Sequence, residues 1–241
     1  MGFDDFYFSE LVTQACKNWL FVWELFWLIW ETNKGEFIEM KRAEQLAKTR
    51  QAILKTATTL FLKKGFSGAS TRDIAKQIGI TQPALYHHFN DKEVLYLAVL
   101  TNLCGKVRQD INKVMRKQQI APEERLYGIT EVLKKHHPLN VYDQYQEAKR
   151  ELSESAQRKL DMLFTMDYIE PIADFFKLPE VNLRPELLPR EAAELFLADL
   201  APIFDSFQPI GGHAISEEQR TKLILGCILR GLTVAEPASE K

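Results

Sequence analysis

Cysteine is scarce in this chain of 241 residues, where Cys16, Cys104 and Cys227 stand far apart and share no spacing. Disulfide-rich secreted domains and cysteine-ligated metal sites both need several cysteines at short, regular intervals. Neither class of protein fits this sequence. We therefore expect a reducing, cytoplasmic environment.

The sequence also lacks the residue patterns of common enzyme classes. It contains no serine nucleophile elbow, no pair of catalytic carboxylates and no zinc-ligand spacing. His136 and His137 are adjacent, and neighbours in a helix point about 100° apart, so they do not make a metal-binding pair. We predict no enzymatic activity, no cofactor and no metal site.

Strand patterns are missing as well. From Met40 onward no stretch of useful length alternates apolar and polar residues, whereas apolar residues recur at helical spacing between short loops. The sequence therefore predicts an all-α fold.

Tryptophan is confined to one segment, since Trp19, Trp23, Trp27 and Trp30 are the only four in the chain. The apolar run 20–30 around them is too short for a membrane span, which needs about 20 residues. Acidic residues precede it, unlike the basic start of a signal peptide. The segment could be a helix on a membrane surface, although its acidic flanks oppose this, or a helix that packs on the protein or on a partner.

A third interpretation is that residues 1–39 precede the natural start of translation. Lys34, Gly35 and Glu36 can be encoded by a purine-rich sequence that resembles a ribosome-binding site, and Met40 follows three codons later. We expect translation to begin at Met40, with 1–39 as an upstream tryptophan-rich leader.

Charge is distributed unevenly although the net charge is only −2. Residues 40–92 contain ten Lys or Arg and three acids, which gives +7, whereas residues 1–39 carry −5 and residues 93–241 carry −4. A basic module on an acidic remainder suits contact with phosphates. The charge step predicts a phosphate-contacting module over 40–92 and a separate domain over 93–241.

The stretch 71–89 has the outline of two short helices joined by a turn that contains Gly79. Gly79 fits the left-handed position that ends a helix, and Ser70 and Thr81 are suited to cap the two helices. Pro83 falls in the first turn of the second helix, where a missing N–H costs little. Asn90 and Glu93 predict a further capping pair for the helix that follows.

This helix-turn-helix pattern extends over neighbouring residues in both directions. The extended pattern resembles the DNA-binding domain of the TetR family of bacterial transcriptional regulators. The resemblance implies an N-terminal three-helix helix-turn-helix domain that binds DNA, over 40–92. It also implies a helical ligand-binding, regulatory and dimerisation domain over 93–241. The matching runs are Ile53–Leu54, Ala57–Phe61, Lys64–Phe66, Ser70–Ala75, Gly79–Thr81, Leu85–Phe89 and Asp91–Glu93.

The resemblance also implies contacts with double-stranded operator DNA. The start of the first helix would meet the DNA backbone or a base edge, and Gln82 would bond adenine beside a thymine methyl. Tyr86 and His88 on the second helix would contact phosphates. The family often varies the residue at the position of His87. The predicted DNA-binding residues are Thr71, Arg72, Thr81, Gln82, Pro83, Ala84, Tyr86, His87, His88 and Lys92.

The body is expected to end in a helix over 216–234, opened by a capping box of Ser216 and Gln219. Its apolar stripe predicts packing on more than one side. By resemblance the last two helices of each subunit form the interface of a homodimer, although a monomer core would use the same stripe. The predicted interface residues are Leu223, Ile224, Ile228 and Leu232.

The resemblance implies a repressor that a small-molecule effector releases from a palindromic operator by tilting the fourth helix. Aromatic side chains of the body are candidate walls of the effector pocket, or plain core, and nothing identifies the ligand. An alternative is a helical interaction protein without an effector, regulated by a protein partner or bound peripherally to a membrane. The candidate pocket residues are Tyr142, Tyr145, Phe164, Tyr168, Phe175 and Phe176.

Overall fold

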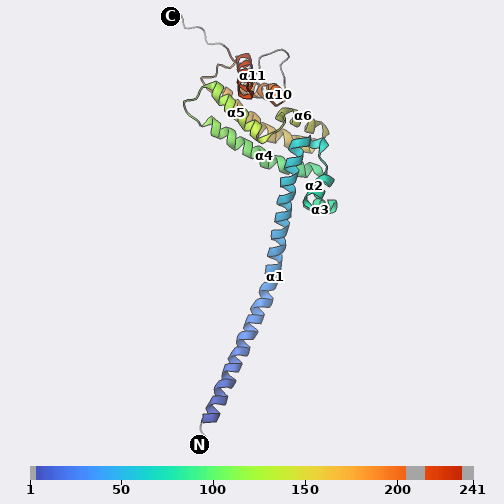
Figure 1. Ribbon diagram of the computed structural model, residues 1–241, viewed down its shortest axis with the longest axis vertical. Coiled ribbons are helices and arrows are strands. Elements are labelled where there is room, and N and C mark those ends of the chain that lie inside the picture. Colours follow the sequence, from blue (N-terminus) through green and yellow to red (C-terminus); the bar gives the residue numbers. More distant parts are fainter. Residues whose placement is uncertain (1–3, 205–214, 235–241) are drawn as a thin grey trace. The chain divides into compact units, whose positions relative to one another are not determined.

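The computed structural model describes residues 4–204 and 215–234, and over these residues it is helical apart from one isolated bridge between Leu183 and Thr233 (Figure 1). The chain divides into two compact units, Met1–Gln51 and Ala52–Lys241. The helices are α1 (Asp4–Gly68), α2 (Thr71–Ile78), α3 (Gln82–His88), α4 (Lys92–Met115), α5 (Pro122–His136), α6 (Val141–Glu151), α7 (Glu154–Phe164), the π-helix η1 (Thr165–Ile169), α8 (Glu170–Phe176), α9 (Pro189–Asp199), α10 (Ala201–Phe204) and α11 (Glu217–Leu232).

The first unit is helical and solvent-exposed where its side chains are described. Trp23, Trp27 and Trp30 are all exposed, and their spacing places them on one face of the helix. The side chains of Cys16 and Trp19 lie outside the described residues. No helix within residues 4–204 or 215–234 combines the length and hydropathy needed to cross a membrane.

The second unit contains two hydrophobic cores. We call residues 52–91 the head and helices α4–α11 the body. The head core gathers apolar side chains from α1, α2, α3 and the start of α4, and the body helices α6 and α7 complete it. The body core lies farther along α4, which packs against α5, α7 and α8. Figure 1 shows α4 and α5 running antiparallel beside each other.

Local signals set the helix ends of the head largely as the sequence predicted. The Ser70 hydroxyl accepts the N–H of Asp73 at 3.0 Å, and Gly79 ends α2 in the left-handed region at φ 75°. Gly65 interrupts α1 with φ 70° and ψ −176°, at the predicted end of the first head helix.

The predicted cap of α4 is wrong by one residue. Asp91, not Asn90, is the N-cap, and its carboxylate accepts the N–H of Val94 at 2.7 Å. A charged Asp at this position has the same capping geometry as Asn and also complements the helix dipole. Glu93 is thereby free to bond Ser153 of the body, whose N–H and hydroxyl it accepts at 2.7 and 2.6 Å.

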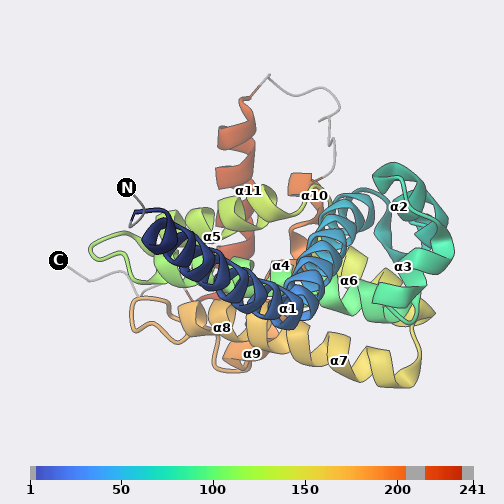
Figure 2. The same cartoon turned by 90° about the horizontal axis from the view of Figure 1, so that it is seen from below.

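One helical turn in the body is wider than its neighbours. The N–H of Glu170 bonds the carbonyl of Thr165, which makes η1 a π-helix that joins α7 to α8 without a break. Figure 2 shows α7 and α8 following each other along one side of the second unit. Asp167 and Tyr168 of η1 are both buried.

Candidate functional site

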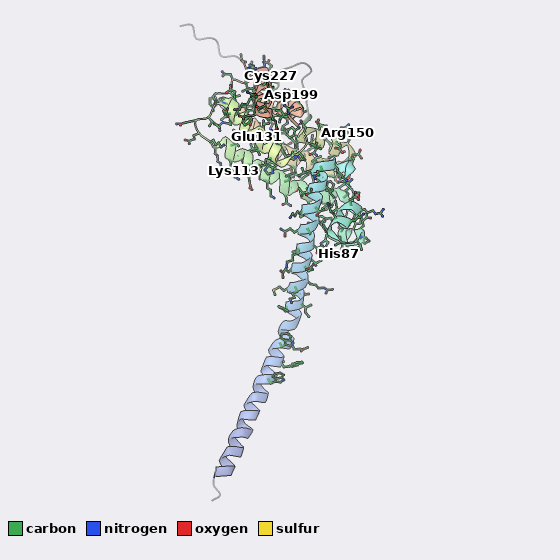
Figure 3. All side chains as sticks on the ribbon, in the orientation of Figure 1. His87, Lys113, Glu131, Arg150, Asp199 and Cys227 are labelled. Atoms are coloured by element: carbon green, nitrogen blue, oxygen red, sulfur yellow. The ribbon has the colours of Figure 1, made fainter. Side chains whose placement is uncertain are left out.

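Helix α3 is held on the head by two buried side chains, and the rest of its surface is open. Leu85 and Phe89 are fully buried in the head core, as their spacing of four residues predicts. Pro83, Ala84, Tyr86 and His87 are exposed, while Gln82 and His88 are half-buried. Figure 3 labels His87 on α3 and Cys227 on α11 at opposite ends of the second unit. The exposed side of α3 is therefore accessible and carries the polar Tyr86 and His87 beside the apolar Pro83 and Ala84.

Three of the predicted DNA-binding residues form one hydrogen-bonded cluster. The Thr71 hydroxyl lies 3.1 Å from the Tyr86 hydroxyl, and Gln82 Nε2 donates to Thr71 Oγ1 at 3.0 Å. Gln82 Nε2 also lies 3.5 Å from Tyr86 Oη. Thr71 is only 6% exposed and Tyr86 is 39% exposed. This Thr71 cluster ties the start of α2 to α3, with Thr71 beneath the surface and Tyr86 on it.

The other predicted DNA-binding residues flank this cluster. Arg72 is exposed at the start of α2, and Thr81 caps α3 by accepting the N–H of Ala84 at 3.3 Å. Lys92 lies at the start of α4 with its Nζ 4.3 Å from the centroid of the Phe66 ring. Burial lowers the pKa of Lys92, against the carboxylates of Glu151 and Glu147, which raise it. Its ammonium group therefore helps to cover the head core as well as carrying charge.

A small cavity lies where the head core meets the body. The volume open to the centres of water molecules inside it is about 30 Å³, which holds about two waters. A drug-sized ligand needs about 300–1,000 Å³. Fifteen residues line it, and none is Lys, Arg, Asp or Glu: Phe61, Leu62, Tyr96, Val99, Leu100, Leu103, Cys104, His137, Val141, Gln144, Tyr145, Leu160, Leu163, Phe164 and Tyr168.

The predicted pocket aromatics divide into two groups. Tyr145, Phe164 and Tyr168 line the cavity as a stack, with ring centroids 4.1 Å apart for the first pair and 5.2 Å for the second. Tyr142 packs against Tyr145 outside the lining, at 6.2 Å. Phe175 and Phe176 lie in the body core and do not line the cavity.

His137 is a cavity residue that the sequence reasoning missed. It is 3% exposed, its Nε2 lies 2.8 Å from Tyr168 Oη, and its Nδ1 has no hydrogen-bond partner in the described part of the chain. Burial, with a smaller contribution from the neighbouring His136, lowers the pKa of His137 to about 4, so the ring is neutral at neutral pH. Burial likewise raises the pKa of the Cys104 thiol to about 12. An adjacent pair of histidines in the sequence gave no signal for this role.

The predicted dimer residues fall on different sides of α11. Leu223 is 58% exposed, Ile224 and Ile228 are half-buried, and Leu232 is buried in the body core. Leu225 and Leu229 are the inward-facing residues of the helix. The apolar stripe therefore packs into this subunit's own core at Leu232 and leaves an exposed apolar side chain at Leu223. The predicted capping box of Ser216 and Gln219 is confirmed.

Residues 53–99 match the family of bacterial regulatory proteins named tetR, over the helices that build the head and the start of α4. The head of this chain is thus similar to the DNA-binding domain of TetR-family regulators. It is similar to the HTH-type transcriptional repressor KstR2 of Mycolicibacterium smegmatis, with 27% identity over 208 residues that cover 80% of this chain and 94% of that protein. The predicted resemblance to TetR-family DNA-binding transcriptional regulators is confirmed.

Solved structures of TetR regulators have the same fold. One from Agrobacterium tumefaciens superposes with a TM-score of 0.60 at 19% identity, over 78% of this chain and 100% of that one. AibR, solved in complex with isovaleryl coenzyme A and operator DNA, gives a TM-score of 0.52 at 24% identity, over 74% of this chain and 96% of that one. The predicted all-α fold, with a helix-turn-helix domain on a helical domain, is confirmed.

Proposed function

We propose that this chain is a homodimeric TetR-family repressor that binds a palindromic operator through α3 and leaves it when a small molecule enters the body. The observation that carries the proposal is the exposed side of α3, with polar and small apolar side chains, which the buried Leu85 and Phe89 anchor to the head core. A surface of this shape and polarity fits the major groove, which admits one helix.

Specific roles follow from the position of each side chain. Arg72 and Tyr86 are exposed and His88 is half-buried, and these three side chains would bond phosphates, whose contacts supply most of the affinity. Pro83 and Ala84 are exposed and apolar, which suits a thymine methyl.

The homodimer would form through α11. Leu223 leaves a large apolar side chain in solvent, next to the half-buried Ile224 and near Cys227. A twofold pair of α3 helices would then meet half-sites about 34–36 Å apart or a multiple of that distance.

The effector would enter the cavity between the head core and the body. Its lining carries no formal charge at neutral pH, which favours a neutral and largely apolar ligand, or the apolar part of a larger one. AibR binds isovaleryl coenzyme A, a ligand with an apolar acyl group. Because the cavity is small, a ligand must push its walls apart, and an off-DNA conformation that binds it better would be favoured.

The test is selection of DNA from a library of random duplexes by the full chain, followed by binding titrations at several salt concentrations. We expect a palindromic consensus and an affinity that falls steeply with salt. Arg72→Ala should lower the slope of log affinity against log salt by about one.

Arg116→Ala is the matched control, because Arg116 ends α4 about 36 Å along the helix axis from Lys92, by the helical rise per residue. It removes the same charge and should leave the salt slope unchanged. Failure to enrich any sequence, or an affinity that ignores salt, would refute operator binding.

A further inference from the structure

Thr71 is predicted from sequence to touch DNA, but its hydroxyl lies under the recognition helix α3. It is 6% exposed, and both of its polar neighbours, Gln82 and Tyr86, belong to α3. A hydroxyl in this position can accept one hydrogen bond and donate another, so it can hold the two α3 side chains together. Thr71 is therefore placed to control Gln82 and not to contact a base itself.

The nitrogen of the Gln82 amide is already committed within the protein. Nε2 lies 3.0 Å from Thr71 Oγ1, to which it donates one of its two hydrogens, and 3.5 Å from Tyr86 Oη; because these two oxygens are themselves only 3.1 Å apart, the same hydrogen faces both of them. The structure gives Oε1 of Gln82 no hydrogen-bond partner among residues 4–204 and 215–234. The oxygen is thus the amide atom that has no partner in the protein, whereas the nitrogen is held toward Thr71.

We propose that Thr71 is a positioning residue that fixes Gln82 as a hydrogen-bond acceptor toward the major groove. Held in this way, Gln82 takes a base with an exocyclic amino group, which is adenine N6 or cytosine N4. Guanine and thymine present only acceptors at these positions and are disfavoured. The proposal rests on the operator binding proposed above and adds which bases the operator carries opposite Gln82.

The orientation matters because a free glutamine has a different preference. An unrestrained amide can bond adenine through both its oxygen and its nitrogen, and it can turn its nitrogen toward guanine or thymine. The Thr71 cluster holds the nitrogen toward the protein, so the amide cannot turn over to present its nitrogen in place of its oxygen. Discrimination between amino and carbonyl bases then depends on a hydroxyl that never touches the DNA.

The experiment compares wild-type, Thr71→Val, Thr71→Ser and Gln82→Ala full chains in selection from a random duplex library. The base pair that Gln82 contacts is the one at which Gln82→Ala loses its preference. Each protein is then titrated with four duplexes that differ only there. We expect wild type to favour adenine or cytosine on the contacted strand by on the order of tenfold, the size of one good base contact.

Thr71→Val keeps the size and branching of Thr71 and removes the hydroxyl, so most of that preference should disappear. Thr71→Ser keeps the hydroxyl and should retain the preference. In the Gln82→Ala background Thr71→Val should change nothing further at this base pair, because its effect passes through Gln82. Thermal unfolding of each variant checks that the head is folded, and Thr71→Ala replaces Thr71→Val if that variant does not fold.

Three results would overturn the proposal. Wild type could prefer guanine or thymine at this base pair, which would mean that the amide faces the other way. Thr71→Val could keep the wild-type base preference at unchanged affinity, or it could lower the affinity for all four duplexes by the same factor. Either result would mean that Thr71 has only a structural role. If wild type enriches no sequence at all, operator binding itself is wrong and the role of Thr71 falls with it.

Discussion

Two tyrosine hydroxyls in this molecule make similar hydrogen bonds in opposite surroundings. Tyr86 is 39% exposed and bonds Thr71 at 3.1 Å on the head, whereas Tyr168 is 1% exposed and bonds His137 at 2.8 Å in the body. Water can replace a partner at the surface, but a buried group that loses its partner keeps the full cost of desolvation. Tyr86 can therefore exchange its bond for one with water or DNA at little cost, while Tyr168 depends on its partner within the body.

The largest effect on stability should come from removing the buried tyrosine. Tyr168→Ala deletes a fully buried ring that stacks on Phe164, and it should lower the free energy of unfolding by about 3–5 kcal/mol. Tyr168→Phe keeps the ring, leaves His137 without a partner, and should cost about 1–3 kcal/mol. Urea unfolding measures both. Equal losses for the two variants would show that packing is not the main term.

The next largest effect on stability should come from acid, which acts on the buried His137 that is bonded to Tyr168. The pKa of His137 is lowered from 6.5 to about 4 by burial, so the unfolded chain binds a proton at a higher pH than the folded chain does. The contribution of neutral His137 to the free energy of unfolding is complete above pH 6.5. It is lost as the pH falls toward 4, by on the order of 3 kcal/mol. His137→Leu should flatten this part of the profile of unfolding free energy against pH.

His136→Gln is the neighbouring control, because His136 is bonded to Asp110 at 2.9 Å and its variant keeps the buried ring of His137. It should retain most of the slope between pH 6.5 and 4. A His137→Leu profile that parallels the wild type would contradict the assignment.

A smaller effect is expected where the head meets the body. Gly65 has φ 70° and ψ −176°, a region almost confined to glycine, and a Cβ there would lie 2.7 Å from Glu147 Oε1. Gly65→Ala should cost about 1–3 kcal/mol in urea unfolding. Gly105→Ala in α4 meets nothing within 4 Å and should stabilise by about 0.5–1 kcal/mol. Equal shifts for the two variants would show that the Gly65 conformation carries no strain.

The smallest effect on stability should follow loss of the exposed tyrosine. Tyr86→Ala should change the unfolding free energy by less than about 1 kcal/mol, since Thr71 keeps its bond to Gln82. It should nevertheless weaken binding to the selected operator by about tenfold, through a lost phosphate contact. Gln77→Ala, which is exposed on α2, is the control and should alter neither quantity. A drop in stability as large as that of Tyr168→Phe would erase the contrast between the two tyrosines.

Local signals made the head predictable from sequence. Ser70, Gly79 and Thr81 act on backbone groups within a few residues, so their roles follow from order and spacing alone. The two buried anchors of α3 also followed from spacing. Asn90 failed because Asp91 beside it is an equally good cap, and spacing does not choose between such neighbours.

Contacts between distant residues were not predictable in this way. One hydrogen bond joins Thr71 to Gln82, and another joins His137 to Tyr168, which is 31 residues away in the sequence. Leu232 belongs to the apolar stripe of α11 but turns into the body core, because a stripe gives the width of an apolar face and not its rotation against neighbours. The DNA contacts, the dimer residues and the start at Met40 remain predictions.

The wide turn at Thr165–Ile169 has a consequence for comparing this chain with its relatives. A π-turn holds one residue more than the α-turn it replaces, and removal of one residue there would restore an ordinary helix. The two flanking helices could then keep their own buried faces, with Tyr168 as the position most affected. Alignments should therefore show a one-residue gap within 165–169, and chains with that gap should have lost the aromatic partner of His137.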